Sequence, residues 1–122
     1  MANNKERPEL SKNLLKNIDS DEEYFQNEVI RPVIKMQSDL IKSHVLHQFE
    51  QMKVDLEKLE LLKKRKQITS LTQQNQQFKK ELIGIVVGQF SIDELKKYHT
   101  MQKNLSKRIV QIIRNRMVDQ LA

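Results

Sequence analysis

The chain has 122 residues and no cysteine, which fits a single domain and excludes disulfides, thiolate metal sites and cysteine nucleophiles. Two glycines and two prolines predict few tight turns, and because only 5% of the residues are aromatic, the core must consist mainly of aliphatic side chains and methionine. The net charge of +6 is divided unevenly. Residues 21–62 carry nine acidic and five basic groups, whereas residues 63–122 carry thirteen basic and four acidic groups.

Residues 1–19 are polar and contain Pro8, so they predict a flexible tail ahead of a single helical domain over residues 20–122. The tail has no apolar stretch of the kind found in a secretory signal. The longest apolar run, Ile85 to Val87, is far shorter than the about 20 residues that a membrane span requires. We therefore expect a cytoplasmic protein without a membrane partner.

A long first helix, roughly 60 Å in length at the usual rise per residue, is predicted over residues 21–62. Ser20 and Glu23 have the spacing of a capping box at its start. Pro32 favours a kink, because the apolar stripe continues past it; the alternative is a short helix over 21–31 and a second helix with Pro32 in its first turn. The stripe recurs in steps of three and four: Val29, Val33, Met36, Leu40, Ile41, Val45, Phe49, Met52, Leu56 and Leu59.

The second half of this stripe, from Val45 to Leu59, has near-heptad spacing with charged residues around it. This pattern is typical of a coiled-coil seam, and it also fits an ordinary packed helix of a bundle. A first helix of this length would extend beyond the two shorter helices that follow it. The exposed remainder would need a partner, so we predict a homodimer.

Two further helices are predicted, of about 18 and about 28 residues. Thr69, Ser70 and Thr72 are candidate caps for the first of them, and Gly88 could end it in a left-handed cap. The spacing of Gly84 and Gly88 also favours close helix packing. Ser91 and Glu94 form a second capping box at the start of the last helix. The apolar spacing predicts that this helix turns the following residues inward: Leu95, Tyr98, Leu105, Ile109, Ile112, Ile113 and Met117. The predicted fold class is all-α, with a long kinked first helix packed against two antiparallel helices.

The strongest candidate site is a run of four cations, Lys63, Lys64, Arg65 and Lys66. Such a run suits an acidic partner surface or phosphate groups. The alternative is that these cations simply stabilise the C-terminal end of the first helix. The last helix adds a second basic region, in which Arg108 and Arg116 could instead pair with the acidic first helix; its candidate site residues are Lys107, Arg108 and Arg114.

These observations favour a non-enzymatic interaction or scaffold module that contacts an acidic protein. The alternative is a nucleic-acid- or ribosome-associated accessory protein that uses Lys63 to Lys66 together with the last helix. No phosphate-binding loop or nucleophile motif is present, and no cofactor is expected. His44 and His47 share a helix face and could supply two metal ligands, with Glu50 or Gln51 as a third partner one turn on. No aspartate or glutamate has a ligand spacing before them, so no metal site is predicted.

Three segments, Phe25 to Gln37, Leu82 to Phe90 and Asn104 to Ile109, resemble a small helical family found in flavobacterial-type genomes. The resemblance covers about residues 24–121. Members sometimes carry the label glyoxalase, which would imply a metal-dependent lyase or isomerase. Metal-dependent glyoxalases bind their metal through histidine and glutamate on a β-rich scaffold, whereas this chain predicts helices throughout. The resemblance implies no catalytic residues here, but it implies that Phe25 to Glu28 and Arg31 to Pro32 belong to a fixed part of the fold.

Overall fold

The protein is all-α over residues 18–122, the part of the chain that the computed structural model describes. The predicted tail lies outside these residues except for Ile18 and Asp19, which are helical. In chain order the elements are α2 (Ile18–Phe25), a π-helical segment η2 (Gln26–Ile30), α3 (Arg31–Met36), α4 (Ser38–Gln51), a 3-10 turn η3 (Leu56–Lys58), α5 (Leu61–Gln74), α6 (Gln76–Val87), α7 (Ile92–Thr100) and α8 (Gln102–Leu121).

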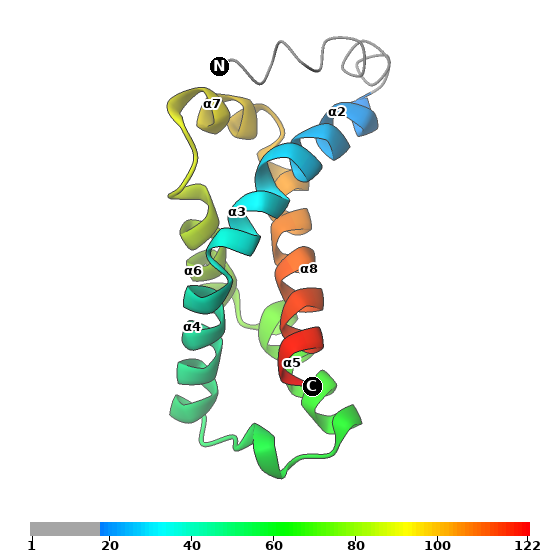
Figure 1. The fold of residues 1–122 in the computed structure, drawn as a ribbon, viewed down its shortest axis with the longest axis vertical. Helices are drawn as coiled ribbons and strands as arrows, with labels where there is room; N and C mark the ends of the chain where they lie inside the picture. Colours follow the sequence, from blue (N-terminus) through cyan, green and yellow to red (C-terminus); the bar gives the residue numbers. More distant parts are fainter. Residues whose placement is uncertain (1–17) are drawn as a thin grey trace.

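Helices α4, α6 and α8 run along the long axis of the molecule, and α7 lies across its upper end (Figure 1). The connection between α4 and α5 closes the lower end, close to the C-terminus. Helices α5 and α6 both pack against α8, which therefore forms the centre of the bundle. No helix among the described residues is both long and apolar enough to cross a membrane.

Pro32 lies within a helical run that continues from Ile18 to Met36 through α2, η2 and α3. It occupies the first turn of α3, which directly follows η2. The wider turn of a π-helix gives a proline ring room against the preceding turn. The chain leaves helical geometry five residues later, at Gln37 (φ −95°, ψ 12°), and the kinked first helix is not confirmed.

The π segment also shifts the buried face of the first helices. Buried residues follow one another at Phe25, Ile30, Ile34, Ser38 and Ile41, so the step across η2 is five residues instead of four. A stripe of apolar residues predicted with a constant helical period therefore lies one residue away from the buried face after η2. This is why two members of the predicted stripe, Met36 and Leu40, are 64% and 55% exposed.

The prediction of one helix through Leu62 is wrong, because α4 ends at Gln51. Lys53 adopts a left-handed conformation (φ 61°). Its backbone N–H donates to Glu50 O at 3.0 Å, and the N–H of Val54 donates to Phe49 O at 2.9 Å. These two bonds are the Schellman arrangement that ends a helix. The chain then turns back through η3, so the predicted coiled-coil seam does not continue along one helix.

The boundaries of the later helices also differ from the prediction. Asn75 separates α5 from α6, and its side chain accepts a hydrogen bond from the Phe78 N–H at 3.0 Å. Thr69, Ser70 and Thr72 therefore lie inside α5 and cap nothing. Likewise Ser20 lies inside α2, which already includes Ile18.

The predicted capping box at Ser91 and Glu94 is confirmed, with both of its hydrogen bonds present. The helix that it starts is shorter than predicted. It ends at Thr100, and Met101 (φ −133°) separates α7 from α8.

The two glycines do not have the predicted roles. Gly88 follows the end of α6 with an ordinary helical φ of −61°, so it is not a left-handed cap. A Cβ added to Gly84 would meet nothing within 4 Å, so no helix packs closely on it.

One core joins all the helices. Its fully buried side chains include Phe49 from α4, Phe78 from α6 and Met117 from α8. The inward positions predicted for the last helix are largely confirmed, since the following residues are buried: Tyr98, Leu105, Ile109, Ile113 and Met117. Every buried side-chain nitrogen or oxygen among the described residues has a hydrogen-bond partner.

Candidate partner-binding surface

The four cations Lys63, Lys64, Arg65 and Lys66, here named the α5 basic cluster, lie in the first two turns of α5. They are not at the end of the preceding helix, so the interpretation that they stabilise a helix C-terminus is wrong. The N-terminus of a helix carries partial positive charge, and cations there are unfavourable. The N-cap residue Glu60 makes no side-chain capping bond, and the first turn has no acidic residue. The local sequence therefore places positive charge where helix stability disfavours it.

The α5 basic cluster has no anionic partner within residues 21–122. None of its members forms an ion pair with another described residue. Lys63, Arg65 and Lys66 are exposed, and Lys64 is half-buried. The cations are therefore available to a partner from outside.

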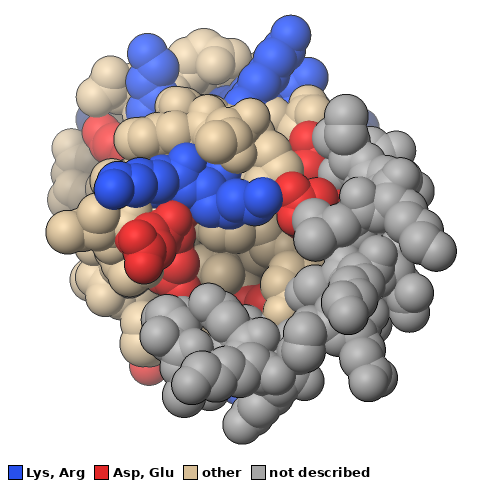
Figure 2. Space-filling model, turned by 90° about the horizontal axis from the view of Figure 1, so that it is seen from above, with Lys and Arg blue, Asp and Glu red and all other residues tan. Residues whose placement is uncertain are grey.

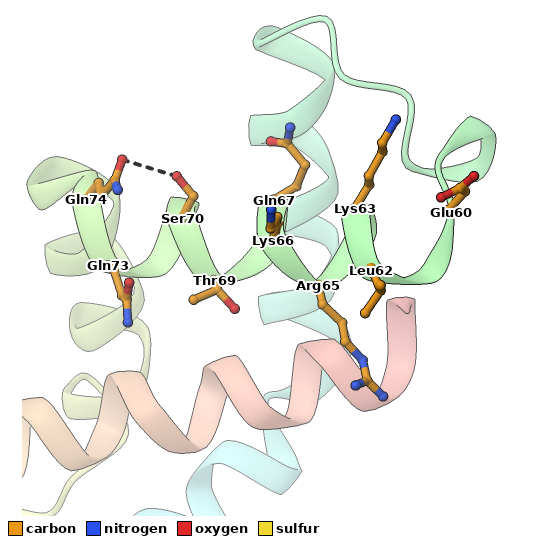
Figure 3. A pocket seen from close by; sticks show the side chains of 10 residues that line it. All are labelled: Glu60, Leu62, Lys63, Arg65, Lys66, Gln67, Thr69, Ser70, Gln73 and Gln74. Carbon is orange, nitrogen blue, oxygen red and sulfur yellow. Dashed lines mark hydrogen bonds between the residues drawn. The ribbon is translucent and has the colours of Figure 1, made fainter.

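A shallow hollow follows the exposed surface of α5 (Figure 3). Lys63, Gln67, Ser70 and Gln74 project from one side of the helix, and the only hydrogen bond drawn among the lining residues is the one from Ser70 Oγ to Gln74 Oε1, at 3.2 Å. Gln67, Ser70 and Gln74 also line an adjoining hollow, which continues to Met52 and Gln76. The basic cluster thus leads into a row of amide and hydroxyl groups that can donate and accept hydrogen bonds.

Exposed apolar side chains lie beside the α5 basic cluster in the sequence. Leu61 is 51% exposed and Leu62 is 70% exposed, and both precede Lys63 directly. Single exposed leucines are common on protein surfaces, but two adjacent ones beside unpaired cations form a mixed apolar and cationic surface. The sequence pattern placed both leucines on the first helix, so their exposure could not be predicted from it.

The second predicted basic region is largely used inside the molecule. Arg108 donates to Gln26 Oε1 at 2.8 Å and approaches Glu22 Oε1 at 3.5 Å. Glu22 is only 3% exposed, and its other carboxylate oxygen accepts from Asn104 Nδ2 at 2.7 Å. The predicted pairing of Arg108 with the acidic first helix is therefore confirmed.

The other arginines of α8 also bind groups within the chain. Arg114 Nε donates to Thr72 Oγ1 at 2.8 Å, which fixes α8 against α5. Arg116 pairs with no acidic residue among those described; its Nε donates to the buried hydroxyl of Ser38 at 2.8 Å. Lys107 is exposed and has no ion-pair partner among the described residues, so it is the member of this region that stays available.

The upper end of the molecule has mixed charge, unlike the α5 basic cluster. Figure 2 shows this end from above, with a ridge of Lys and Arg directly beside groups of Asp and Glu. An ion pair of 2.7 Å between Lys97 Nζ and Asp21 Oδ2 joins α7 to α2. Charges of opposite sign therefore compensate one another on this face.

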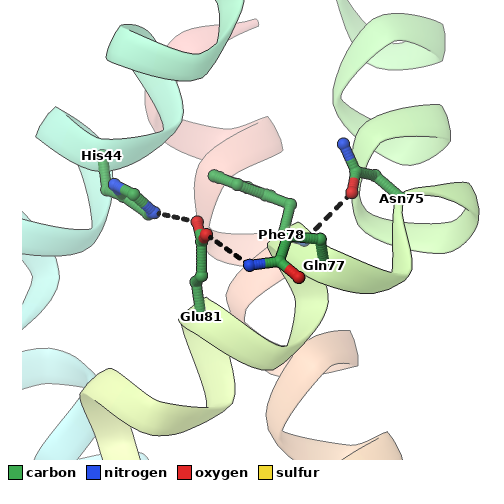
Figure 4. A network of polar contacts seen from close by, with 5 residues as sticks. All are labelled: His44, Asn75, Gln77, Phe78 and Glu81. Atoms are coloured by element: carbon green, nitrogen blue, oxygen red, sulfur yellow. Dashed lines mark hydrogen bonds and ion pairs between the residues drawn. The ribbon is translucent and has the colours of Figure 1, made fainter.

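Within the described residues, no third side chain joins His44 and His47 in a group that could hold a metal ion. His44 Nε2 lies 2.8 Å from Glu81 Oε1, and the His44 ring stacks on Phe78 at a centroid distance of 5.0 Å (Figure 4). The bonds from His44 and Gln77 hold the pKa of the Glu81 carboxyl below its ordinary value of 4.5. His47 is exposed, and the described residues contain no group of three His, Asp or Glu side chains that could hold a metal ion.

No family model matches the chain, and neither a curated protein nor a solved structure matches it. The geometry of the surface is therefore the basis on which a function can be argued.

Proposed function

We propose that this protein is a non-enzymatic interaction module that binds an acidic protein surface through the α5 basic cluster. The observation that carries the proposal is the position of four cations in the first two turns of α5 without an ion-pair partner among the described residues. Two of them, Lys63 and Lys64, lie in the first turn and oppose the helix dipole. These cations destabilise the start of the helix and have no ion-pair partner among the described residues. A second molecule that supplies anionic groups would explain their presence.

A protein partner is favoured over a nucleic acid by the surroundings of the cluster. Leu61 and Leu62 give an apolar contact area next to the cations, which suits a mixed apolar and acidic protein surface. Nucleic-acid sites commonly add aromatic side chains that stack on bases, and the lining of the α5 hollow contains no aromatic residue. Arg108 and Arg114, which the nucleic-acid alternative would use, already bind groups within the chain.

Fluorescence anisotropy tests the proposal with two labelled probes, a poly-glutamate peptide and a poly-uridine strand of equal charge. Lys63→Glu/Lys66→Glu should weaken poly-glutamate binding by about tenfold or more, because two attractions become repulsions. The matched control is Lys103→Glu/Lys107→Glu on α8, which changes the net charge equally at two exposed residues and should leave binding nearly unchanged.

The same assay decides about the alternative function. One outcome would favour a nucleic-acid partner over a protein partner. In that outcome the protein binds poly-uridine tightly, with an affinity that falls steeply with the logarithm of salt concentration, and does not bind poly-glutamate. Equal losses in the α5 and α8 variants would show that neither polymer recognises a particular surface, and the proposal would be wrong.

A further inference from the structure

The lower end of the molecule carries three kinds of surface in chain order. The connection between α4 and α5 contains three exposed acidic residues, Asp55, Glu57 and Glu60. The exposed leucines 61 and 62 follow, and after them the α5 basic cluster begins. Acidic, apolar and basic residues thus succeed one another within twelve positions, 55–66. The connection that carries the acidic ones lies at the lower end of the fold (Figure 1).

The acidic part is almost as free of internal partners as the basic part. Asp55 Oδ2 lies 4.0 Å from Lys58 Nζ, but both side chains are more than half exposed. An ion pair with this exposure contributes little to stability. Glu57 and Glu60 form no ion pair with any residue in the described part of the chain. The acidic connection and the basic cluster are neighbours in the chain, yet no ion pair joins them within the described residues.

Resting on the proposed function, we infer that the acidic partner of α5 is a second copy of this chain. The order acidic, apolar, basic is self-complementary when two copies meet antiparallel. Glu57 and Glu60 of each copy would then face Lys63 and Lys66 of the other, while Leu61 and Leu62 of both copies would meet at the two-fold axis. A two-fold interface requires this self-complementarity, because each copy contributes the same surface.

This reason for a dimer differs from the one that the sequence suggested. The predicted dimer covered the remainder of a first helix of roughly 60 Å, and that remainder does not exist because α4 ends at Gln51. In the dimer inferred here, the second copy instead covers the exposed charges and leucines that the turn after Gln51 brings to the lower end.

A charge exchange between copies tests the inference. Sedimentation velocity should give a dimer for the wild type and monomers for two variants, Glu57→Lys/Glu60→Lys and Lys63→Glu/Lys66→Glu. In each variant residues 57, 60, 63 and 66 all carry the same sign, so the facing positions of two identical copies repel each other. An equimolar mixture of the two variants should restore the dimer, since residues 57 and 60 of each copy then face residues 63 and 66 of opposite charge.

Controls separate loss of association from loss of folding. Glutamates in the first turns of α5 favour the helix dipole, so Lys63→Glu/Lys66→Glu should fold at least as well as the wild type, as measured by circular dichroism and thermal unfolding. If Glu57→Lys/Glu60→Lys fails to fold, the neutral variant Glu57→Gln/Glu60→Gln replaces it, and its dimer should dissociate more readily than that of the wild type. Lys103→Glu/Lys107→Glu should remain dimeric.

The outcomes distinguish this inference from the proposed function. A wild type that binds poly-glutamate through α5 but stays monomeric at the highest concentration it tolerates would overturn the inference alone. A dimer that persists in both charge variants would also overturn it, because another surface would then join the copies. A monomer that binds no acidic peptide would overturn both.

Discussion

Glu22 shows how a charge in this chain is used for structure. It is 3% exposed, and Asn104 and Arg108 of α8 supply its polar contacts. A buried carboxylate is stable only while its charge is compensated. Arg108→Met should therefore lower the free energy of unfolding by about 2 kcal/mol, because Glu22 keeps one hydrogen bond but loses its cation. Urea unfolding measures the change.

Lys107→Met is the control for this prediction. Lys107 is the neighbour of Arg108 in the chain, but it is exposed and has no ion-pair partner among the described residues. Its loss should alter stability by less than about 0.5 kcal/mol. Equal effects of the two substitutions would contradict the structural role of Arg108.

We expect the Glu81 carboxyl to contribute to stability in a way that depends on pH. Its pKa is lowered in the folded state, first by the hydrogen bond from His44 and then by that from Gln77. A lowered pKa means that the contribution is present above the ordinary value of 4.5 and is lost as the pH falls through the folded-state pKa.

Urea midpoints measured from pH 6 to pH 3 check this prediction. The midpoint of Glu81→Gln should fall less steeply than that of the wild type below the ordinary pKa of 4.5, because glutamine has no charge to lose. His44→Phe keeps an aromatic ring near Phe78 and should show the same reduced slope. Identical profiles in all three proteins would show that the contact has no effect on folding.

Two of the residue roles on α8 show what sequence reasoning can and cannot predict. Arg108 was expected to meet the acidic first helix, and it does, because its position beside the apolar stripe directs it to the neighbouring helix. Arg116 has a similar position but donates to Ser38, since the five-residue step across η2 changes which side chains of the first helices face α8. A register change of one residue is enough to exchange one partner for another.

At the scale of elements, Lys53 decides the topology of the lower end. It holds a left-handed conformation that costs an L-residue about 1–2 kcal/mol. Lys53→Gly should stabilise the protein by about 0.5–1 kcal/mol, because the relief of strain exceeds the extra entropy of glycine in the unfolded chain. Thermal unfolding checks the sign. Ser43→Gly in the middle of α4 should destabilise the protein, and a loss of stability in both variants would contradict this account of the turn.

The capping box before α7 gives a second prediction at this scale. The Ser91 hydroxyl accepts from the Glu94 N–H at 3.1 Å, and the Glu94 carboxylate accepts from the Ser91 N–H at 2.8 Å. Ser91→Ala should cost about 1 kcal/mol, and Ser91→Asp should restore most of it, because aspartate is also a good cap. Ser43→Ala, at an exposed position in α4, should be close to neutral. Chemical unfolding of the three variants gives the comparison.

The sequence predicted elements well where the local signal was strong. The helical class, the capping box at Ser91 and the buried face of α8 were all predicted from local pattern. The end of α4 was not, because a lysine in the left-handed position gives no signal like that of glycine. The break at Met101 was missed for a similar reason, since it contains neither proline nor glycine.

At the scale of the whole molecule, the uneven charge has two parts. Lys97 and Arg108 pair with acidic residues of the first helices, so part of the division is complementarity between packed elements. The α5 basic cluster is the part without an internal counterpart within the described residues. The sequence identified its members but placed them at the end of a helix, and the early turn after Gln51 puts them at the start of one.

The most direct test of the central claim is to map where an acidic peptide binds. Backbone amide shifts of the dilute protein, followed by NMR during titration with poly-glutamate, report each residue separately. We expect the largest changes in α5 between residues 61 and 70, and we expect Lys63→Glu/Lys66→Glu to abolish them. Largest changes on α8, or no change at saturating peptide, would contradict it.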